Sequence, residues 1–130
     1  MYLTVAELNV LNVLWTHGRC KLQQIVEILY PNQSLSDFAT VTTLLRRLKT
    51  KGCVACDRSG PRLVHLASVS REEVAVALAE KQADIFCKGS VAALLTELIT
   101  HSKLTAAELY TLRSALGNNA KAKGKVRRTG

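Results

Sequence analysis

The segment from residue 40 to 52 has the most regular alternation of apolar and polar positions in the chain. Its apolar residues recur at the i, i+3, i+4 and i+7 spacing of one helix face: Val41, Leu44, Leu45 and Leu48. Hydroxyl-bearing and cationic residues lie between them, without an acid: Thr40, Thr42, Thr43, Arg46, Arg47 and Lys49. Because a solvated helix face usually mixes Glu with Lys, this pattern predicts a helix whose outer face meets a polyanion.

Three other helices are indicated by a Ser or Thr followed three residues later by Glu, the capping-box pattern. The pairs are Thr4 with Glu7, Ser70 with Glu73, and Thr105 with Glu108. They predict helices over about 4–17, 70–87 and 105–116. We also expect helices over about 21–29 and 90–101, and we expect the basic helix to begin at Ser36 or Asp37 and to cover about 37–51.

The apolar period changes after Gly52. Residues 53–57 and 63–67 have the composition of short strands, and the segment between them contains Gly60-Pro61, a turn signal. This predicts a β-hairpin with Arg58 and Arg62 at its tip. Three helices followed by a hairpin is the order of a winged helix-turn-helix, in which the third helix enters the DNA major groove.

The expected fold is therefore mainly α with a small β-hairpin. We predict a winged helix-turn-helix DNA-binding domain at 1–68, a helical dimerisation domain at 69–116, and a basic tail at 117–130 that is expected to be disordered.

Charge is concentrated in two places. The 130-residue chain has a formal net charge of +8, and five cations with no acid follow Leu116. Within 46–62, six cations stand against the single Asp57. Both concentrations favour a phosphate backbone as the partner. The tail has a second interpretation, as a solubilising end.

No stretch is long and apolar enough to span a membrane, and the N-terminus does not resemble a signal peptide. The four cysteines are therefore expected to be free thiols, and the protein is expected to be cytoplasmic.

The chain resembles the penicillinase-repressor family of winged-helix transcription regulators. The matching segments are Leu3–Leu8, Val13–Trp15, Thr40–Leu48, Lys51-Gly52, Val69–Glu73, Phe86–Ser90 and Leu104–Leu109 with Leu112. The resemblance implies a homodimer that binds a palindromic operator, with the last three helices forming the dimer.

By matching positions, the family's DNA-contacting helix residues fall on Ala39, Thr40, Thr43 and Arg47, and Thr42 and Arg46 also face outward. Some relatives carry a Lys at the place of Ala39, so the operator sequence is expected to differ. We assign more of the affinity to the arginines and more of the base discrimination to the threonines, and we expect phosphate contacts from Arg58 and Arg62. The alternative is that this helix is only a solvated basic face.

The C-terminal helices carry apolar stripes that a short chain cannot easily bury alone. We predict a dimer interface made of Val91, Leu94, Leu95, Leu98, Leu109 and Leu112, with Leu116 in line with the last two. The alternative is that these helices pack on their own winged helix.

Two departures from the family leave the inducing signal open. Relatives that repress β-lactamase genes are inactivated by cleavage of an Asn-Phe bond, where this chain has Glu97-Leu98. Copper-responsive relatives carry paired cysteines near the C-terminus, and here none follows Cys87.

The cysteines are the candidates for a sensing chemistry. Cys53 and Cys56 have C-x-x-C spacing, which makes them weak candidates for metal ligands, but the motif follows a helix C-terminus rather than a helix N-terminus. A redox role for Cys20, Cys53, Cys56 or Cys87 and a purely structural role both remain open.

We see no catalytic constellation, cofactor motif or small-molecule substrate site, so the chain is not expected to be an enzyme. The function we expect is that of a dimeric transcriptional regulator, a repressor, that binds double-stranded operator DNA and not a membrane. The alternatives are a thiol- or metal-responsive regulator on the same fold, and a winged helix used for protein assembly.

Overall fold

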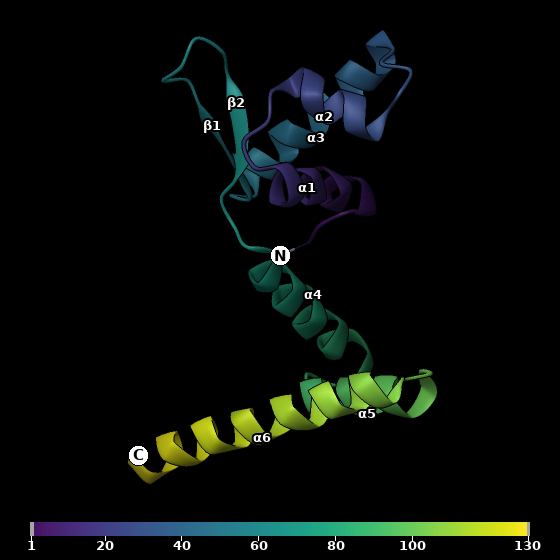
Figure 1. Cartoon of the computed structure of the whole chain (residues 1–130), viewed down its shortest axis with the longest axis vertical. Helices are drawn as coiled ribbons and strands as arrows, with labels where there is room; N and C mark the ends of the chain where they lie inside the picture. Colours follow the sequence, from purple (N-terminus) through teal and green to yellow (C-terminus); the bar gives the residue numbers. More distant parts are fainter. Residues whose placement is uncertain (1, 130) are drawn as a thin grey trace. The chain divides into compact units, whose positions relative to one another are not determined.

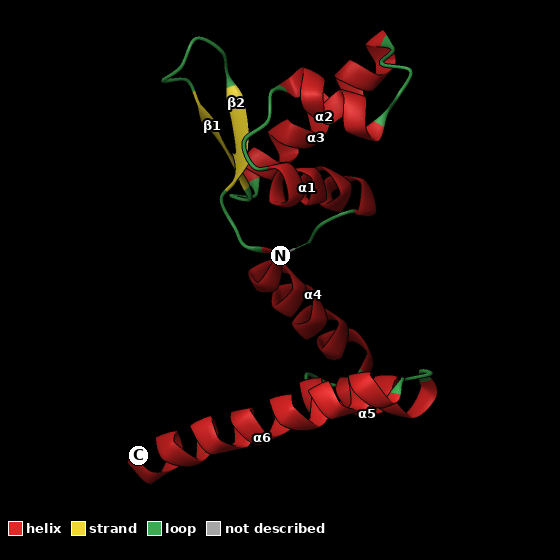
Figure 2. Ribbon diagram, viewed as in Figure 1, coloured by secondary structure: helices red, strands yellow, loops and turns green. Residues whose placement is uncertain are grey.

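A computed structural model describes residues 2–129, with side-chain surroundings described through 121. In this part of the chain it contains six helices and two strands (Figure 2). Their order is α1 (Val5–His17), α2 (Leu22–Leu29), α3 (Leu35–Thr50), β1 (Val54–Asp57), β2 (Val64–Ala67), α4 (Arg71–Phe86), α5 (Val91–His101) and α6 (Ala106–Thr129). This order confirms the prediction of a mainly helical winged-helix fold with a small hairpin.

The chain forms two compact units, Met1–Gly89 and Ser90–Gly130. In the first unit, α1, α2 and α3 gather beside the hairpin (Figure 1). Each of these helices contributes fully buried apolar side chains to one core, among them Leu11, Ile25 and Leu48. Removal of these side chains from water is the main force that holds the three helices together.

The hairpin is antiparallel, and it pairs Val54 with Ala67 and Cys56 with His65. A third segment joins it, because Cys20 and His65 exchange two backbone hydrogen bonds of 3.0 and 2.7 Å. Nothing in the sequence indicated this pairing. It ties the α1–α2 loop to the wing, so the wing does not project from the unit on its own two strands alone.

Two of the predicted capping boxes are complete. Thr4 accepts from the Glu7 amide at 3.2 Å while Glu7 accepts from the Thr4 amide at 2.9 Å. Thr105 and Glu108 form the same reciprocal pair at 3.1 and 2.9 Å. Ser70 caps α4 by accepting from the Glu73 amide at 3.0 Å.

The start of α3 differs from the expectation. The helix begins at Leu35 rather than at residue 37, because Ser34 and Asp37 form a capping box with bonds of 3.1 and 3.0 Å. Asp replaces the usual Glu or Gln at the third helical position, which is why the pattern was missed. The correction adds Leu35 and Ser36 to the helix.

Helix α4 belongs to the first compact unit. Its Val74 is 2% exposed, and the guanidinium of Arg71 lies 5.6 Å from the ring centre of Trp15, whose Nε1 donates to the carbonyl of Val69 at 2.9 Å. The functional boundary at residue 68 and the dimerisation role of 69–116 stay predictions.

Helix α6 continues to Thr129, past the end at 116 that the sequence pattern indicated. The prediction relied on the spacing of apolar residues, which ends at Leu116. The Ala and Lys residues beyond 119 are good helix formers, so the helix can continue without apolar residues. The side chains from 122 onward lie outside the described residues, and disorder of the tail at 117–130 stays a prediction.

Candidate nucleic-acid interface

Helix α3 is oriented by its apolar stripe. Val41 and Leu48 are 0% exposed, and Leu44 and Leu45 are 5% and 6% exposed. The opposite face therefore points away from the core. Of the six predicted contact residues on α3, five are exposed and Thr43 is half-buried: Ala39, Thr40, Thr42, Arg46 and Arg47 are the exposed ones.

The helical period arranges this outward face in two parallel rows. We call them the methyl row, which consists of Leu35, Ala39, Thr42 and Arg46, and the hydroxyl row, which consists of Ser36, Thr40, Thr43 and Arg47. A shallow hollow along the helix is lined by the whole hydroxyl row together with Ala39 and Leu44. The structure thus brings together four of the predicted contact residues, Ala39, Thr40, Thr43 and Arg47, and it adds Ser36.

The threonine hydroxyls are not equally available. Thr40 donates to the carbonyl of Ser36 at 2.9 Å, and Thr42 donates to the carbonyl of Phe38 at 2.8 Å. Because each proton is directed at the backbone of α3, these side chains can offer a base only a methyl group and an acceptor oxygen. Thr43 makes no such bond among the described residues, so its hydroxyl can also donate.

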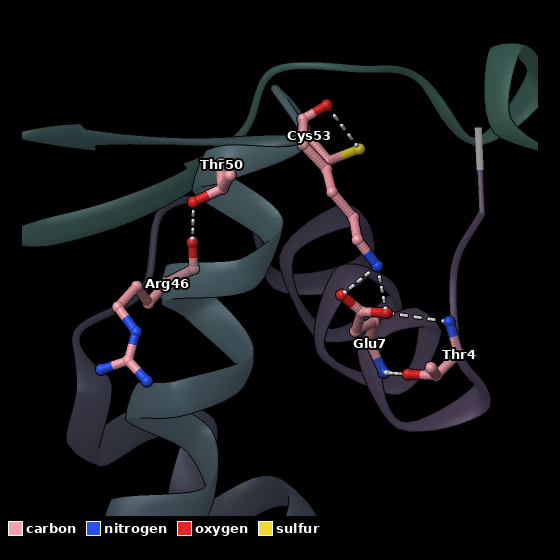
Figure 3. Close-up of polar contacts among 6 residues, drawn as sticks. Thr4, Glu7, Arg46, Thr50 and Cys53 are labelled. Atoms are coloured by element: carbon pink, nitrogen blue, oxygen red, sulfur yellow. Dashed lines mark hydrogen bonds and ion pairs between the residues drawn. The ribbon is translucent and has the colours of Figure 1, made fainter.

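The C-terminal end of α3 is anchored by an ion pair with α1. The Nζ of Lys51 lies 2.8 Å from both carboxylate oxygens of Glu7, which is 0% exposed (Figure 3). Burial by itself would raise the pKa of Glu7, but the hydrogen bonds from Lys51 and Thr4 outweigh it and lower that pKa. Figure 3 shows the Arg46 side chain extending away from this cluster.

The wing presents the two predicted cations. Arg58 and Arg62 are both exposed, on either side of the turn. The nearby Asp57 accepts two hydrogen bonds from Ser59 and one from Arg19, and these bonds lower the pKa of the Asp57 carboxyl. The only acid of the wing is therefore held as a paired carboxylate.

The pairing of Cys20 with His65 brings further cations to the wing. A hollow beside the turn is lined by Arg19, Lys21, Asp57 and Arg62, among other residues. The sequence analysis missed Arg19 and Lys21, because strand pairing between residues 45 apart leaves no local pattern. It also missed Leu35 and Ser36, for which the spacing of Ser34 and Asp37 was an available signal.

The cysteines are not equivalent. Cys20 and Cys53 are 1% and 0% exposed, and burial raises the pKa of both thiols. Cys56 and Cys87 are half-buried. The Sγ of Cys56 lies 3.5 Å from Nδ1 of His65, and burial followed by the charge of Lys49 lowers the pKa of that imidazole. Among the described residues, no group of three or more His, Cys, Asp or Glu side chains is placed to hold a metal ion.

The second unit buries much less of its apolar surface. Helix α5 has no buried residue, and Val91, Leu95 and Leu98 are 39%, 45% and 53% exposed. The other predicted interface residues, Leu94, Leu109 and Leu112, are half-buried. Ile99, which the sequence analysis did not include, lies on the same stripe of α5 and is 41% exposed. None of the helices in the described part of the chain combines the length and apolar character needed to cross a membrane.

Comparison with known proteins identified a family model, a curated relative and a solved structure. The family model described as Penicillinase repressor matches residues 3–118. An uncharacterized 16.5 kDa protein from the ptsI 3' region of Latilactobacillus sakei is 26% identical over 114 residues, which cover 88% of this chain and 77% of the relative. The solution structure of the DNA binding domain of the repressor BlaI matches with 25% identity and a TM-score of 0.46, over 55% of this chain and 85% of that chain.

Proposed function

We propose, from the premise that this chain belongs to the penicillinase repressor family of DNA-binding transcriptional regulators, that it represses transcription as a homodimer on a palindromic operator. In this proposal α3 enters the major groove of each half-site, and the wing lies along the adjacent phosphate backbone. The family is one of regulators rather than of enzymes.

The observation that carries the proposal is the outward face of α3. Apart from the half-buried Thr43, it is exposed over both rows, and it ends in Arg46 and Arg47. It has no acid on it, because Asp37 is the only acid of α3 and its carboxylate caps the helix by accepting from the Ser34 amide. The anchor between Glu7 and Lys51 holds this helix against α1 and so fixes the angle at which the face is presented.

The cations of the wing support the same partner. Arg58 and Arg62 at the turn and Arg19 and Lys21 at its side are suited to phosphate contacts, and the one acid among them is paired with Arg19. Phosphate contacts position a protein on a duplex, whereas base contacts supply the specificity. The arrangement therefore provides both kinds of contact on one unit.

The second copy is inferred from the apolar stripe of α5. Val91, Leu95, Leu98 and Ile99 follow one face of the helix and remain 39–53% exposed. An exposed apolar stripe of this kind is typical of a surface that another chain covers. A symmetric dimer uses one patch twice, and it would place two α3 helices about one DNA turn apart, roughly 34 Å, or a multiple of that spacing.

DNA binding is tested with Arg47→Ala and with Lys103→Ala, which removes the same charge from the second unit. For a duplex that the parent protein binds, we expect Arg47→Ala to weaken binding by about 1–3 kcal/mol and Lys103→Ala to have a much smaller effect. Fluorescence anisotropy against salt concentration measures both, and the affinity of the parent protein should fall steeply with salt. Equal effects of the two substitutions, or an affinity that does not change with salt concentration, would refute α3 as the helix that contacts DNA.

The dimer is tested with Leu98→Asp and with Thr100→Asp as the matched control on the opposite face of α5. The first substitution should give a monomer in sedimentation velocity, because it places a charge in the apolar stripe, and the second should leave the dimer intact. A dimer that survives Leu98→Asp would contradict this interface.

A thiol-responsive regulator is the second candidate, and the contact of Cys56 with His65 is the observation that favours it. Cys56 is only half-buried and has an imidazole at 3.5 Å that can accept the thiol proton, whereas Cys20 and Cys53 are buried. If iodoacetamide lowers DNA affinity, the Cys56→Ser variant should resist the loss and the Cys87→Ser variant should not. Unchanged DNA affinity of the parent protein after complete alkylation of Cys56 would eliminate this candidate.

A further inference from the structure

The methyl row of α3 has an unusual composition for a solvated surface. Leu35, at its start, is 91% exposed, whereas the leucines of the apolar stripe of α3 are buried in the core. The next two members are Ala39 and Thr42, both exposed, and Arg46 closes the row. Three positions in succession thus present hydrocarbon to solvent on the face that the proposed function turns toward DNA.

The hydrogen bond of Thr42 decides what that residue can offer. Its hydroxyl proton is directed at the carbonyl of Phe38, 2.8 Å away in the same helix. The side chain can therefore approach a base with its methyl group and without a free donor. Leu35, Ala39 and Thr42 together form an apolar strip, and Arg46 at its end supplies the attraction to a polyanion that an apolar strip lacks.

We infer that the methyl row recognises the 5-methyl groups of thymines in each operator half-site, and that it is a specificity-determining surface of this chain. The inference rests on the proposed DNA-binding function. The thymine methyl is the apolar group that the major groove exposes, and Ala and Thr methyl groups are suited to contact it. The span from Leu35 to Thr42 is about 10 Å along the helix axis, which equals about three base-pair steps.

The hydroxyl row has a different role in the same half-site. Ser36 and Thr43 have hydroxyls that make no hydrogen bond among the described residues, so they can donate to acceptor atoms on base edges. Two rows of different chemistry on one helix would read two kinds of base-pair edge. This division predicts that thymine replacement and loss of a hydroxyl affect different positions of the operator.

The experiment begins with selection of bound duplexes from a random 30-base-pair library by the full chain. Each thymine of the selected duplex is then replaced singly by deoxyuridine, which keeps base pairing and removes only the methyl group. We expect one to three adjacent positions per half-site at which affinity falls about fourfold, the value for one buried methyl or methylene group of about 0.8 kcal/mol. Other positions should change by less than about 1.5-fold on the same scale.

Paired variants assign the effect to the row. Thr42→Ser removes the methyl and keeps the hydroxyl bond, so it should abolish the deoxyuridine penalty at one position. Thr42→Val keeps a methyl and removes the hydroxyl, so the penalty should persist. Thr43→Ser, the same change at the hydroxyl-row threonine whose hydroxyl is free to donate, should leave all penalties as they are.

The outcomes separate the two levels of inference. Selection that enriches no duplex would overturn the proposed DNA binding itself. Tight binding of a selected duplex with no penalty at any deoxyuridine would overturn thymine recognition and leave DNA binding in place. A penalty that is the same in Thr42→Ser and in the parent protein would overturn the assignment to Thr42.

Discussion

Helices α3 and α5 carry apolar side chains at the same helical spacing, and the two stripes have opposite surroundings. In α3, Val41 and Leu48 are 0% exposed, whereas in α5, Val91 and Leu98 are 39% and 53% exposed. The stripe of α3 packs on the apolar surfaces of α1 and α2, and α5 has no buried residue at all. Each fully buried side chain of this size contributes about 1.5–3 kcal/mol, so the difference in burial is a large difference in local stability.

The polar faces of the two helices differ in their charge. On α3 the face opposite the stripe is exposed and cationic, and its one acid is used in the cap. On α5 the polar face contains Glu97 and His101, and the Oε2 of Glu97 lies 3.4 Å from the Nε2 of His101 at i,i+4 spacing. A hydrophobic period therefore specifies where a helix has an apolar face, but the side chains around that face decide which surface is left for a partner.

The largest expected effect comes from truncating one leucine in each apolar stripe and comparing the losses of stability. Leu48→Ala should lower the free energy of unfolding by about 2–5 kcal/mol, because it leaves a cavity in the core of the first unit. Its loss should be independent of protein concentration. Leu98→Ala should instead give a loss that shrinks on dilution, because it removes only the stability that association of two chains adds.

Urea denaturation at two protein concentrations, about tenfold apart, distinguishes the two kinds of loss. A Leu98→Ala variant whose stability loss is as large as that of Leu48→Ala at both concentrations would show that α5 has a covering surface within its own chain.

The next effect concerns the anchor of α3. Lys51→Met should lower the free energy of unfolding by about 3 kcal/mol, because it leaves the buried carboxylate of Glu7 without its cation. We take the lower end of the range for such a loss, since the Lys51 side chain is 32% exposed and water can partly replace it. Lys49→Met, an exposed cation two residues away, is the control and should change stability by less than about 0.5 kcal/mol.

Thermal and urea unfolding give this comparison, and equal effects of the two substitutions would contradict the anchor. The affinity for DNA provides a second readout, because an anchor that sets the angle of α3 should also weaken binding by the Lys51→Met protein when it is still folded.

The anchor also predicts how stability changes with acid. The pKa of Glu7 is lowered in the folded protein, so its ionised form contributes stability that is fully present above the unfolded value of about 4.3 and is lost as pH falls through the lower folded value. Glu7→Gln should therefore be less stable than the parent protein at pH 7, and the gap should narrow below about pH 4. Glu97→Gln, on an exposed face of α5, should show no such convergence.

The measurement is the free energy of unfolding at pH 7, 5 and 3.5. A gap between Glu7→Gln and the parent protein that stays constant over this range would show that the Glu7 carboxylate does not stabilise the fold through its charge.

The sequence was sufficient for features that local chemistry determines. The stripe of α3, the capping boxes at Thr4 and Thr105, and the turn between the two strands all depend on residues within one or two turns of each other, and all are present. The same reasoning placed the start of α3 too late, because it did not consider Asp37 as the partner of Ser34.

Features that depend on distant residues were not predicted. The pairing of Cys20 with His65 and the ion pair of Arg19 with Asp57 join segments 45 and 38 residues apart, and neither leaves a period in the sequence. The hydroxyl bonds of Thr40 and Thr42 are local, but a sequence gives no choice between a threonine that donates to its own helix and one that donates to a ligand. The composition of the candidate site was therefore predictable, and the chemistry that each side chain presents was not.

The smallest expected effect compares two capping boxes of the same kind. Thr4→Ala removes the cap of α1, and α1 is part of the first core, so global stability should fall by about 1 kcal/mol. Thr105→Ala removes the equivalent cap of α6, whose described side chains are exposed or half-buried. Loss of this cap should appear mainly as fraying of the first turn of α6. A helix end that is not packed against a core can open locally, so its stability contributes little to the free energy of global unfolding.

Amide hydrogen exchange near residues 106–108 measures that fraying, and urea unfolding measures the global term. Thr105→Ala should speed local exchange and move the global transition by no more than about half as much as Thr4→Ala does. If dimer formation covers α6, the result should change at protein concentrations above the dissociation constant. Thr105→Ala should then lower the free energy of global unfolding and no longer act mainly on local amide exchange. A Thr105→Ala effect that stays local at every concentration would place the start of α6 outside any dimer interface.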